Sequence, residues 1–219
     1  MIDMKKKETR SEFEKRRQRA LSINKKLKEI FPDSKIILNY SSSWELLVAV
    51  ILSAQCTDKI VNKVTEKLFK KYPKFDDYLG VPLNEFAQDI KSAGFYNNKA
   101  KNILATAHLI QEKFNGKVPA SMNELLTLPG VARKTANVVL GNAFNIVEGI
   151  AVDTHVKRLS QKFKLSDEID PNKIEKDLMS ILPKEDWMKF TYRLIEYGRT
   201  YSTARDKDKN TDPISILIK

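Results

Sequence analysis

Apolar residues recur along this chain at the three- and four-residue spacing of amphipathic α-helices. The first such stripe consists of Ala20, Ile23, Leu27, Ile30 and Phe31. Ser11 followed by Glu14 predicts a capping box at the start of this helix. A stretch over 44–54 is apolar at almost every position, which predicts a helix buried on all sides.

Further helices follow from the same spacing and from turn residues. Thr57 can cap a helix over roughly 58–72, and a long stripe of apolar residues ends at Asn115-Gly116, a pair typical of a left-handed helix end. A capping box opens a short helix over 121–126, and Asp170-Pro171 marks another helix start. Alternating runs bounded by turn residues are almost absent, so we expect an all-α chain without a sheet.

Composition narrows the class of protein. A chain of 219 residues can form one ordinary domain or two small lobes. The net charge of +11 indicates a polyanionic partner such as nucleic acid, although a solvated lysine-rich surface would give the same number. Cys56 is the only cysteine, which excludes an intramolecular disulfide, fits a reducing compartment and argues against a zinc site. The longest apolar run, Leu46–Leu52, is too short to cross a membrane, and the first ten residues lack an apolar secretion signal.

The sequence Leu128-Pro129-Gly130-Val131-Ala132-Arg133-Lys134 predicts a tight turn between a short helix and a longer one. Glycine at 130 can take a positive φ and let the backbone approach a partner closely. The first N–H groups of the second helix then favour an anion, and a phosphate bound there would be recognised without regard to base sequence. An ordinary helix–turn–helix connection is the alternative.

Lys134 lies in the first turn of that second helix, beside Arg133. The helix dipole and the neighbouring cation both disfavour an ammonium group at this place. An amine that gives up its proton is what a Schiff-base nucleophile requires. The alternative is a solvated surface lysine.

Asp153-Thr154-His155 follows an apolar run and precedes another helical stripe. Aspartate is a favoured N-cap, so a structural role accounts for Asp153 on its own. A cap can also be a catalytic carboxylate that accepts a proton and stabilises positive charge on a sugar.

Five blocks of this chain resemble, in the same order, the motifs of the endonuclease III family of DNA repair enzymes. They are Glu45-Leu46-Leu47, 52–58 (LSAQCTD), 90–100 (IKSAGFYNNKA), 128–139 (LPGVARKTANVV) and 151–155 (AVDTH). The resemblance covers roughly residues 20–205 and implies two all-α lobes with the active-site cleft between them. A six-helix barrel would span 38–150, with the helix–hairpin–helix motif at about 121–144, and the second lobe would combine 1–37 with 151–219.

The resemblance also implies an activity: a bifunctional DNA glycosylase that removes oxidised pyrimidines and cuts the strand 3′ to the abasic site by β-elimination. Lys134 would attack the sugar and Asp153 would assist, while Gln55 and Phe95 would fill the gap left by the flipped nucleotide. Without the resemblance, Gln55 is interpreted as a polar helix end and Phe95 as a core aromatic. The remaining DNA contacts implied are Gly130, Val131, Ala132, Arg133, Thr154 and His155. The partner would be double-stranded DNA with a damaged base or abasic site, bound by a cytoplasmic, nucleoid-associated monomer.

The chain departs from the family near its C-terminus. Family members typically bind a [4Fe–4S] cluster through four cysteines, but Ser202 stands in the place of the first, and Lys209, Asp212 and Ile218 fall near the other three. We therefore expect no cluster, no other cofactor and no metal. We also expect a flexible tail after about residue 205, unless Ile214 and the apolar residues after it pack back on the lobe. Ala132 replaces a second hairpin glycine found in many relatives, so its φ must be negative.

Three other interpretations compete. An adenine-excising relative would place a carboxylate in the first barrel helix, where 47–52 (LVAVIL) has none, and usually lacks the lysine. A dedicated abasic-site lyase would use the same Lys134. A non-catalytic DNA-binding module would explain the charge and the hairpin, but it has no need of both Lys134 and Asp153.

Overall fold

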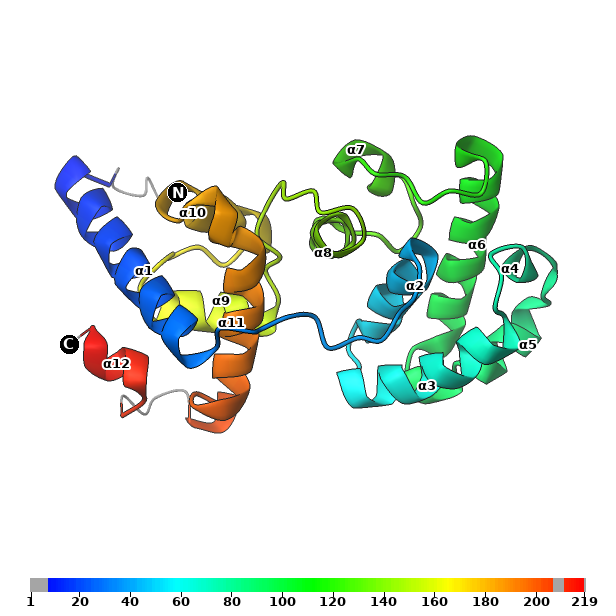
Figure 1. Ribbon diagram of the computed structural model, residues 1–219, viewed down its shortest axis with the longest axis horizontal. Coiled ribbons are helices and arrows are strands. Elements are labelled where there is room, and N and C mark those ends of the chain that lie inside the picture. The colour runs from blue at the N-terminus through cyan, green and yellow to red at the C-terminus, as the bar shows by residue number, and fades with distance from the viewer. Residues whose placement is uncertain (1–7, 207–210, 219) are drawn as a thin grey trace, which may run out of the picture. The chain divides into compact units, whose positions relative to one another are not determined.

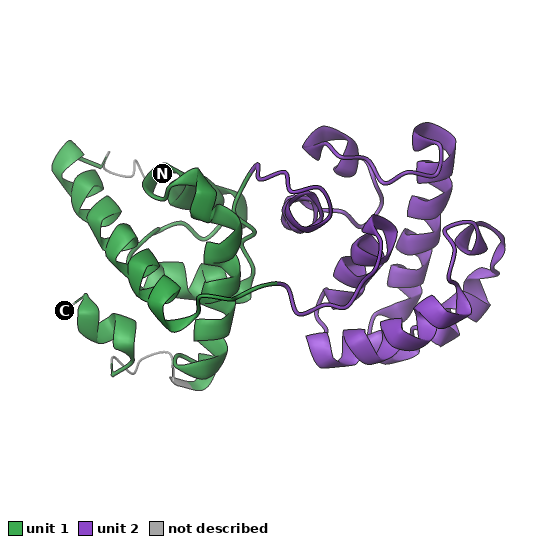
Figure 2. Cartoon of the chain, in the orientation of Figure 1, with its two compact units in different colours: residues 1–35, 149–219 green, residues 36–148 purple. Residues whose placement is uncertain are grey.

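The computed structural model describes residues 8–206 and 211–218, and every regular element within them is a helix (Figure 1). The prediction of an all-α chain is confirmed. The chain divides into two compact units (Figure 2): unit 1 consists of residues 1–35 and 149–219, and unit 2 of residues 36–148. The boundaries expected from the sequence, 38 and 150, lie slightly later in the chain than those of unit 2. At the second boundary, Ile150 packs into the core of unit 1 and so belongs to that unit.

Unit 2 is built around one apolar helix. Its elements are α2 (Ser43–Ser53), α3 (Asp58–Lys71), α4 (Asp77–Gly80), α5 (Leu83–Asp89), the 3₁₀ helix η1 (Lys91–Ala93), α6 (Tyr96–Phe114), α7 (Met122–Leu125) and α8 (Arg133–Ala143). Two of these helices, α4 and α7, are single turns, so the unit has more helical segments than the six that the resemblance implies. All residues of α2 from Leu46 to Leu52 are buried, because α3, α6 and α8 pack around it.

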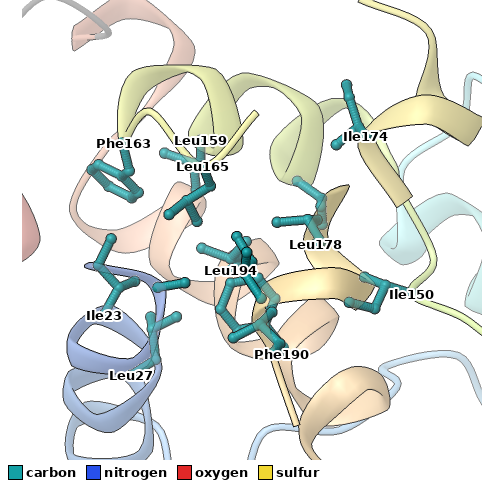
Figure 3. Packing of buried hydrophobic residues seen from close by; sticks show 14 of the residues in the cluster. Ile23, Leu27, Ile150, Leu159, Phe163, Leu165, Ile174, Leu178, Phe190 and Leu194 are labelled. Atoms are coloured by element: carbon teal, nitrogen blue, oxygen red, sulfur yellow. The ribbon is translucent and has the colours of Figure 1, made fainter. Parts of the chain in front are cut away.

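Unit 1 joins the first helix of the chain to its last ones. Its elements are α1 (Arg10–Ile30), α9 (Thr154–Lys162), α10 (Pro171–Ile181), the 3₁₀ helix η2 (Lys184–Asp186), α11 (Trp187–Thr200), the 3₁₀ helix η3 (Ala204–Asp206) and α12 (Pro213–Leu217). Figure 3 shows Ile23 and Leu27 of α1 with Phe163 and with Phe190 and Leu194 of α11 around a shared core. The apolar stripe predicted for the first helix is therefore its buried face.

The helix ends follow the capping residues, with one exception. Thr57, Ser121 and Asp170 accept first-turn N–H groups as expected. The capping box expected at Ser11 and Glu14 is wrong: Thr9 and Glu12 form it instead, so α1 begins earlier, at Arg10. A Thr at the N-cap satisfies the same donors as Ser would, and the two boxes are only two residues apart.

The described part of the C-terminal segment forms a short helix. Residues 211–218 contain α12, and its Ile214 is fully buried in the core of unit 1, whereas Ile216 and Leu217 are exposed. The expectation of a flexible tail after about residue 205 is therefore wrong for 211–218. Its alternative, packing back on the lobe, holds for Ile214 and Ile218. None of the helices in the described part of the chain is long and apolar enough to cross a membrane.

Candidate active site

The turn between α7 and α8 requires a glycine for two independent reasons. Gly130 has φ +76°, and a Cβ atom at this position would lie 2.9 Å from Asn102 Nδ2 of α6. The Thr106 hydroxyl, also on α6, donates to the Pro129 carbonyl at 2.9 Å and fixes the turn from the same side. The sequence predicted the backbone conformation, while the close approach of Asn102 depends on tertiary packing.

Lys134 is an exposed residue in the first turn of helix α8. Ala132 is the N-cap, with φ −95°, so the expected negative φ is confirmed. Alanine has no side-chain oxygen to cap the first turn, and this is the arrangement in which an anion binds a helix N-terminus. Arg133 is half-buried and the Lys134 side chain is exposed, whereas Val131 is buried and can offer a partner only its backbone.

Gln55 and Phe95 are exposed side chains on left-handed backbone. Gln55 follows the end of α2 with φ 51°, and Phe95 is the N-cap of α6 with φ 47°. A non-glycine residue in this conformation costs about 1 kcal/mol or more, and such residues cluster at functional sites. Phe95 is 64% exposed, so its interpretation as a core aromatic is wrong. Exposure of a large aromatic on strained backbone instead fits a residue that meets a partner.

Asp153 has the structural role that the sequence predicted. Its Oδ1 accepts from the Val156 N–H at 2.8 Å, and it is the N-cap of α9. Burial lowers the pKa of Arg158, one turn further along α9, and attraction to the Asp153 carboxylate opposes that change. Asp153 belongs to unit 1, whereas Lys134 belongs to unit 2.

The two residues after Asp153 have different surroundings. Thr154 is exposed, whereas the Nδ1 atom of His155 is buried. A Cβ atom at Gly198 of α11 would lie 2.5 Å from that atom, so His155 fills the space over a glycine of the neighbouring helix. The His155 ring therefore packs α9 against α11, a role that the sequence did not indicate.

Polar side chains occupy two of the four positions where the resemblance implies cluster ligands. Ser202 and Asp212 are both buried, and the Lys162 ammonium donates to Asp212 Oδ2 at 2.8 Å and to Ser202 Oγ at 2.9 Å. The Tyr197 hydroxyl donates to Asp212 Oδ1, and the Ser215 N–H and hydroxyl donate to the same carboxylate at 3.0 and 2.7 Å. These five residues are called the Asp212 network below.

The Asp212 network does not fit an iron–sulfur cluster. Such a cluster needs thiolate ligands, yet the one cysteine, Cys56, belongs to unit 2. Ile218 is apolar and packs against the core of unit 1, and Lys209 lies outside the described residues. Within 8–206 and 211–218, no group of three or more histidine, cysteine, aspartate or glutamate side chains is placed to hold a metal ion.

Lys99 of unit 2 has a structural role that the sequence does not indicate. It lies within the block 90–100, which resembles a family motif. In the structure its side chain is buried and its Nζ donates to the carbonyl oxygens of Leu52 and Ala93, each at 2.8 Å. No local signal in the sequence points to this, because the two carbonyls come from other elements.

Comparisons with known proteins identify the relatives of this chain. Residues 48–184 match the family model described as "HhH-GPD superfamily base excision DNA repair protein". Endonuclease III of Synechocystis sp. is 50% identical over 190 residues, which is 87% of either chain, and that of Bacillus subtilis is 50% identical over 195 residues, which is 89% of either chain. A solved structure of a trapped Endonuclease III–DNA covalent intermediate is 44% identical, with a TM-score of 0.86, and covers 90% of this chain and 93% of its own. A non-covalent Endonuclease III–DNA complex is 43% identical, with a TM-score of 0.87, and covers 93% of this chain and 95% of its own.

Proposed function

Since the chain belongs to the endonuclease III family of helix–hairpin–helix base excision repair proteins, we propose that it removes damaged bases from DNA with Lys134 as its nucleophile. The chain is a DNA N-glycosylase with abasic-site lyase activity, and its partner is double-stranded DNA that carries a damaged base or an abasic site. The observation that carries the choice of Lys134 is its place, exposed in the first turn of α8 and directly after the Gly130 turn.

The proposed reaction needs one amine and one carboxylate. The deprotonated Lys134 Nζ forms a bond to the sugar C1′ while the bond from C1′ to the base breaks, and the base leaves with the electron pair. Opening of the sugar ring gives an imine. Loss of a C2′ proton then expels the 3′ phosphate, which cuts the strand, and water later releases the lysine. Asp153 is proposed to take up the amine proton and to stabilise positive charge on the sugar as the base departs.

The hairpin is proposed to hold the DNA strand through its backbone. The proposed contact lies where the turn leads into α8, because the helix dipole favours a phosphate at the first N–H groups of a helix. The residues proposed to form it are Gly130, Val131, Ala132 and Arg133. Such a contact does not depend on the base sequence, and a repair enzyme that acts throughout the DNA requires this independence. Thr154, exposed at the start of α9, and His155 are the DNA contacts proposed in unit 1.

Gln55 and Phe95 are proposed to fill the gap that a flipped nucleotide leaves. Taking a base out of the stack costs a few kcal/mol, and a side chain inserted in its place offsets part of this free energy by packing against the neighbouring bases. Phe95 has the exposure that this task needs, and its backbone is left-handed. The damaged base is taken to be an oxidised pyrimidine, the class that the resemblance implies.

We further propose that this enzyme acts without an iron–sulfur cluster. Endonuclease III homologues normally carry a [4Fe–4S] cluster. In this chain Asp212, which falls near one of the ligand positions, forms a buried ion pair with Lys162 instead. The proposed chemistry at Lys134 and Asp153 uses no iron.

Borohydride trapping tests the proposal, because borohydride reduces an imine to a stable covalent adduct. Wild-type protein should form an adduct with duplexes that contain thymine glycol or an abasic site. Lys134→Ala should form none, while Lys113→Ala, which removes an exposed lysine at the end of α6, should behave as wild type. An adduct with the abasic duplex alone would identify a dedicated lyase. If neither duplex is trapped, the protein is a DNA-binding module and the proposal is wrong.

A further inference from the structure

Lys99 carries a buried charge that two backbone carbonyls satisfy. The residue is 6% exposed, and its ammonium donates to Leu52 O and Ala93 O, each at 2.8 Å. Lysine is rarely buried, and burial lowers the pKa of this ammonium group. Its place in the first turn of α6 adds the unfavourable dipole of that helix. A methionine could fill the same space without these costs, so what the lysine adds is its hydrogen-bond donors.

The two carbonyls lie at the ends of two different helices. Leu52 is in the last turn of α2, and Ala93 is the last residue of the 3₁₀ helix η1. Carbonyls at a helix C-terminus have no partner within the helix and carry its negative dipole end. One ammonium group therefore caps both ends at once.

Each of these helix ends leads directly into one of the strained, exposed residues. Gln55 comes three positions after Leu52, and Phe95 comes two positions after Ala93. The Lys99 backbone N–H also donates to the Phe95 carbonyl at 3.1 Å. Lys99 thus holds the chain before Phe95 through its side chain and at Phe95 through its backbone N–H. Left-handed backbone persists only where the surroundings determine it in this way.

We propose that Lys99 is a positioning residue that ties the Gln55 and Phe95 loops together, so that the two side chains meet the DNA duplex as one preformed wedge. The proposal rests on the wedge role proposed above for these residues. A wedge held in place before binding does not have to be ordered when the base is flipped, so more of the binding free energy serves to open the stack. Lys99 itself touches neither the DNA strand nor the reacting sugar in this role.

The test compares Lys99→Met with Lys101→Met. The first variant keeps the length and apolar stem of the side chain but removes its three donors. The second removes the same charge from an exposed position on the same helix. In single-turnover excision of thymine glycol from a duplex, we expect Lys99→Met to lose about 10- to 100-fold in rate, the effect of misplacing a reacting geometry by about 1 Å. Lys101→Met should change the rate by less than about twofold. Equal rates for the two variants would overturn the proposal.

Two further measurements separate positioning from damage to the fold. A single-stranded abasic oligonucleotide has no base stack to open, so Lys99→Met and wild type should form the borohydride adduct with it equally well. If Lys99→Met forms less adduct with this oligonucleotide than wild type does, the proposal is overturned. The double variant with Phe95→Ala should be no slower on the duplex than the slower single variant, because both changes disable one wedge. If the two losses multiply instead, Lys99 does not act through Phe95. Should Lys99→Met fail to fold, Lys99→Gln replaces it in the same comparisons.

The wild-type reactions distinguish this inference from the proposed function. If wild-type protein forms no borohydride adduct with either damaged duplex, the glycosylase proposal itself fails. If wild type reacts normally and Lys99→Met matches Lys101→Met, only the positioning role fails.

Discussion

Replacing Asp212 with alanine should destabilise unit 1 far more than the loss of an ordinary helix cap. Asp212 is the N-cap of α12, where it precedes Pro213, and Asp170 has the same place before Pro171 at the start of α10. The two aspartates differ in their surroundings. Asp170 is exposed, whereas Asp212 is buried against the ammonium group of Lys162.

The expected magnitude follows from that difference. The side chains of Lys162 and Asp212 are 10% and 5% exposed, and their charged atoms are 2.8 Å apart. Removing one partner of a buried ion pair costs about 3–5 kcal/mol, because the remaining buried charge loses this attraction. Losing an exposed cap such as Asp170 costs about 1 kcal/mol. We therefore expect Asp212→Ala to lower the free energy of unfolding by about 4 kcal/mol and Asp170→Ala by about 1 kcal/mol.

The assay is urea-induced unfolding followed by tryptophan fluorescence. The chain has two tryptophans: Trp44 in unit 2 and Trp187, which packs against the core of unit 1. In a Trp44→Phe background, Trp187 reports on unit 1 alone. If Asp212→Ala and Asp170→Ala cost the same free energy there, the ion pair contributes nothing and the reasoning is refuted.

Acid should remove the contribution of the Asp212 charge. Burial by itself would raise the pKa of Asp212, but hydrogen bonds from Lys162, Tyr197 and Ser215 more than offset this and lower the pKa to about 2. An aspartate in the unfolded chain has a pKa of about 3.9, so its ionisation stabilises the folded state by about 2–3 kcal/mol above that pH. This stability is lost as the pH falls from about 4 to about 2. The difference in unfolding free energy between wild type and Asp212→Ala should therefore narrow over this window, and a constant difference would contradict the assignment.

Other substitutions test the candidate site and its supports. Gly130→Ala forces a positive φ on alanine and brings its Cβ against Asn102, so we expect a loss of about 1–3 kcal/mol in stability and weaker binding of abasic DNA in a gel-shift titration. Asp153→Asn keeps a good N-cap, so the unfolding free energy should change by less than about 0.5 kcal/mol while base excision falls by at least about 100-fold; unfolding of the variant would show that the cap dominates. Gly198→Ala places a Cβ 2.5 Å from the His155 ring and should cost about 1–3 kcal/mol in the Trp187 assay, whereas an unchanged midpoint would show that the two helices can separate freely. Protein purified without oxygen should contain no stoichiometric iron and show no visible absorption band from a cluster; bound iron would refute the proposal that it acts without one.

Most of the fold could be predicted because its determinants are local. Apolar spacing identifies α2 and α6. Helix starts are marked by Thr57, Asp153 and Asp170, whose side chains accept hydrogen bonds from N–H groups only two or three residues ahead. The first helix shows the limit of such signals, because Thr9-Glu12 and Ser11-Glu14 offer nearly equivalent caps and the structure uses the first.

The parts that could not be predicted depend on contacts between distant segments. The burial of Lys99 depends on the carbonyls that α2 and η1 bring to it, and the packing of His155 depends on Gly198 of another helix. The loss of the cluster cysteines is visible in the sequence, but the interactions of the residues that replace them are not. The ion pair between Lys162 and Asp212 joins residues 50 positions apart, so it exists only in the folded chain.

The way α12 is attached has a consequence for how this protein matures. Helix α12 is attached to unit 1 by the chain's own side chains, namely the ion pair of Asp212 with Lys162 and the buried Ile214. Under the proposal that the protein acts without a cluster, residues 211–218 dock without waiting for a cofactor, and the supply of iron does not limit this step. A protein of this kind is expected to refold from urea in a chelating, aerobic buffer and to regain its full activity there.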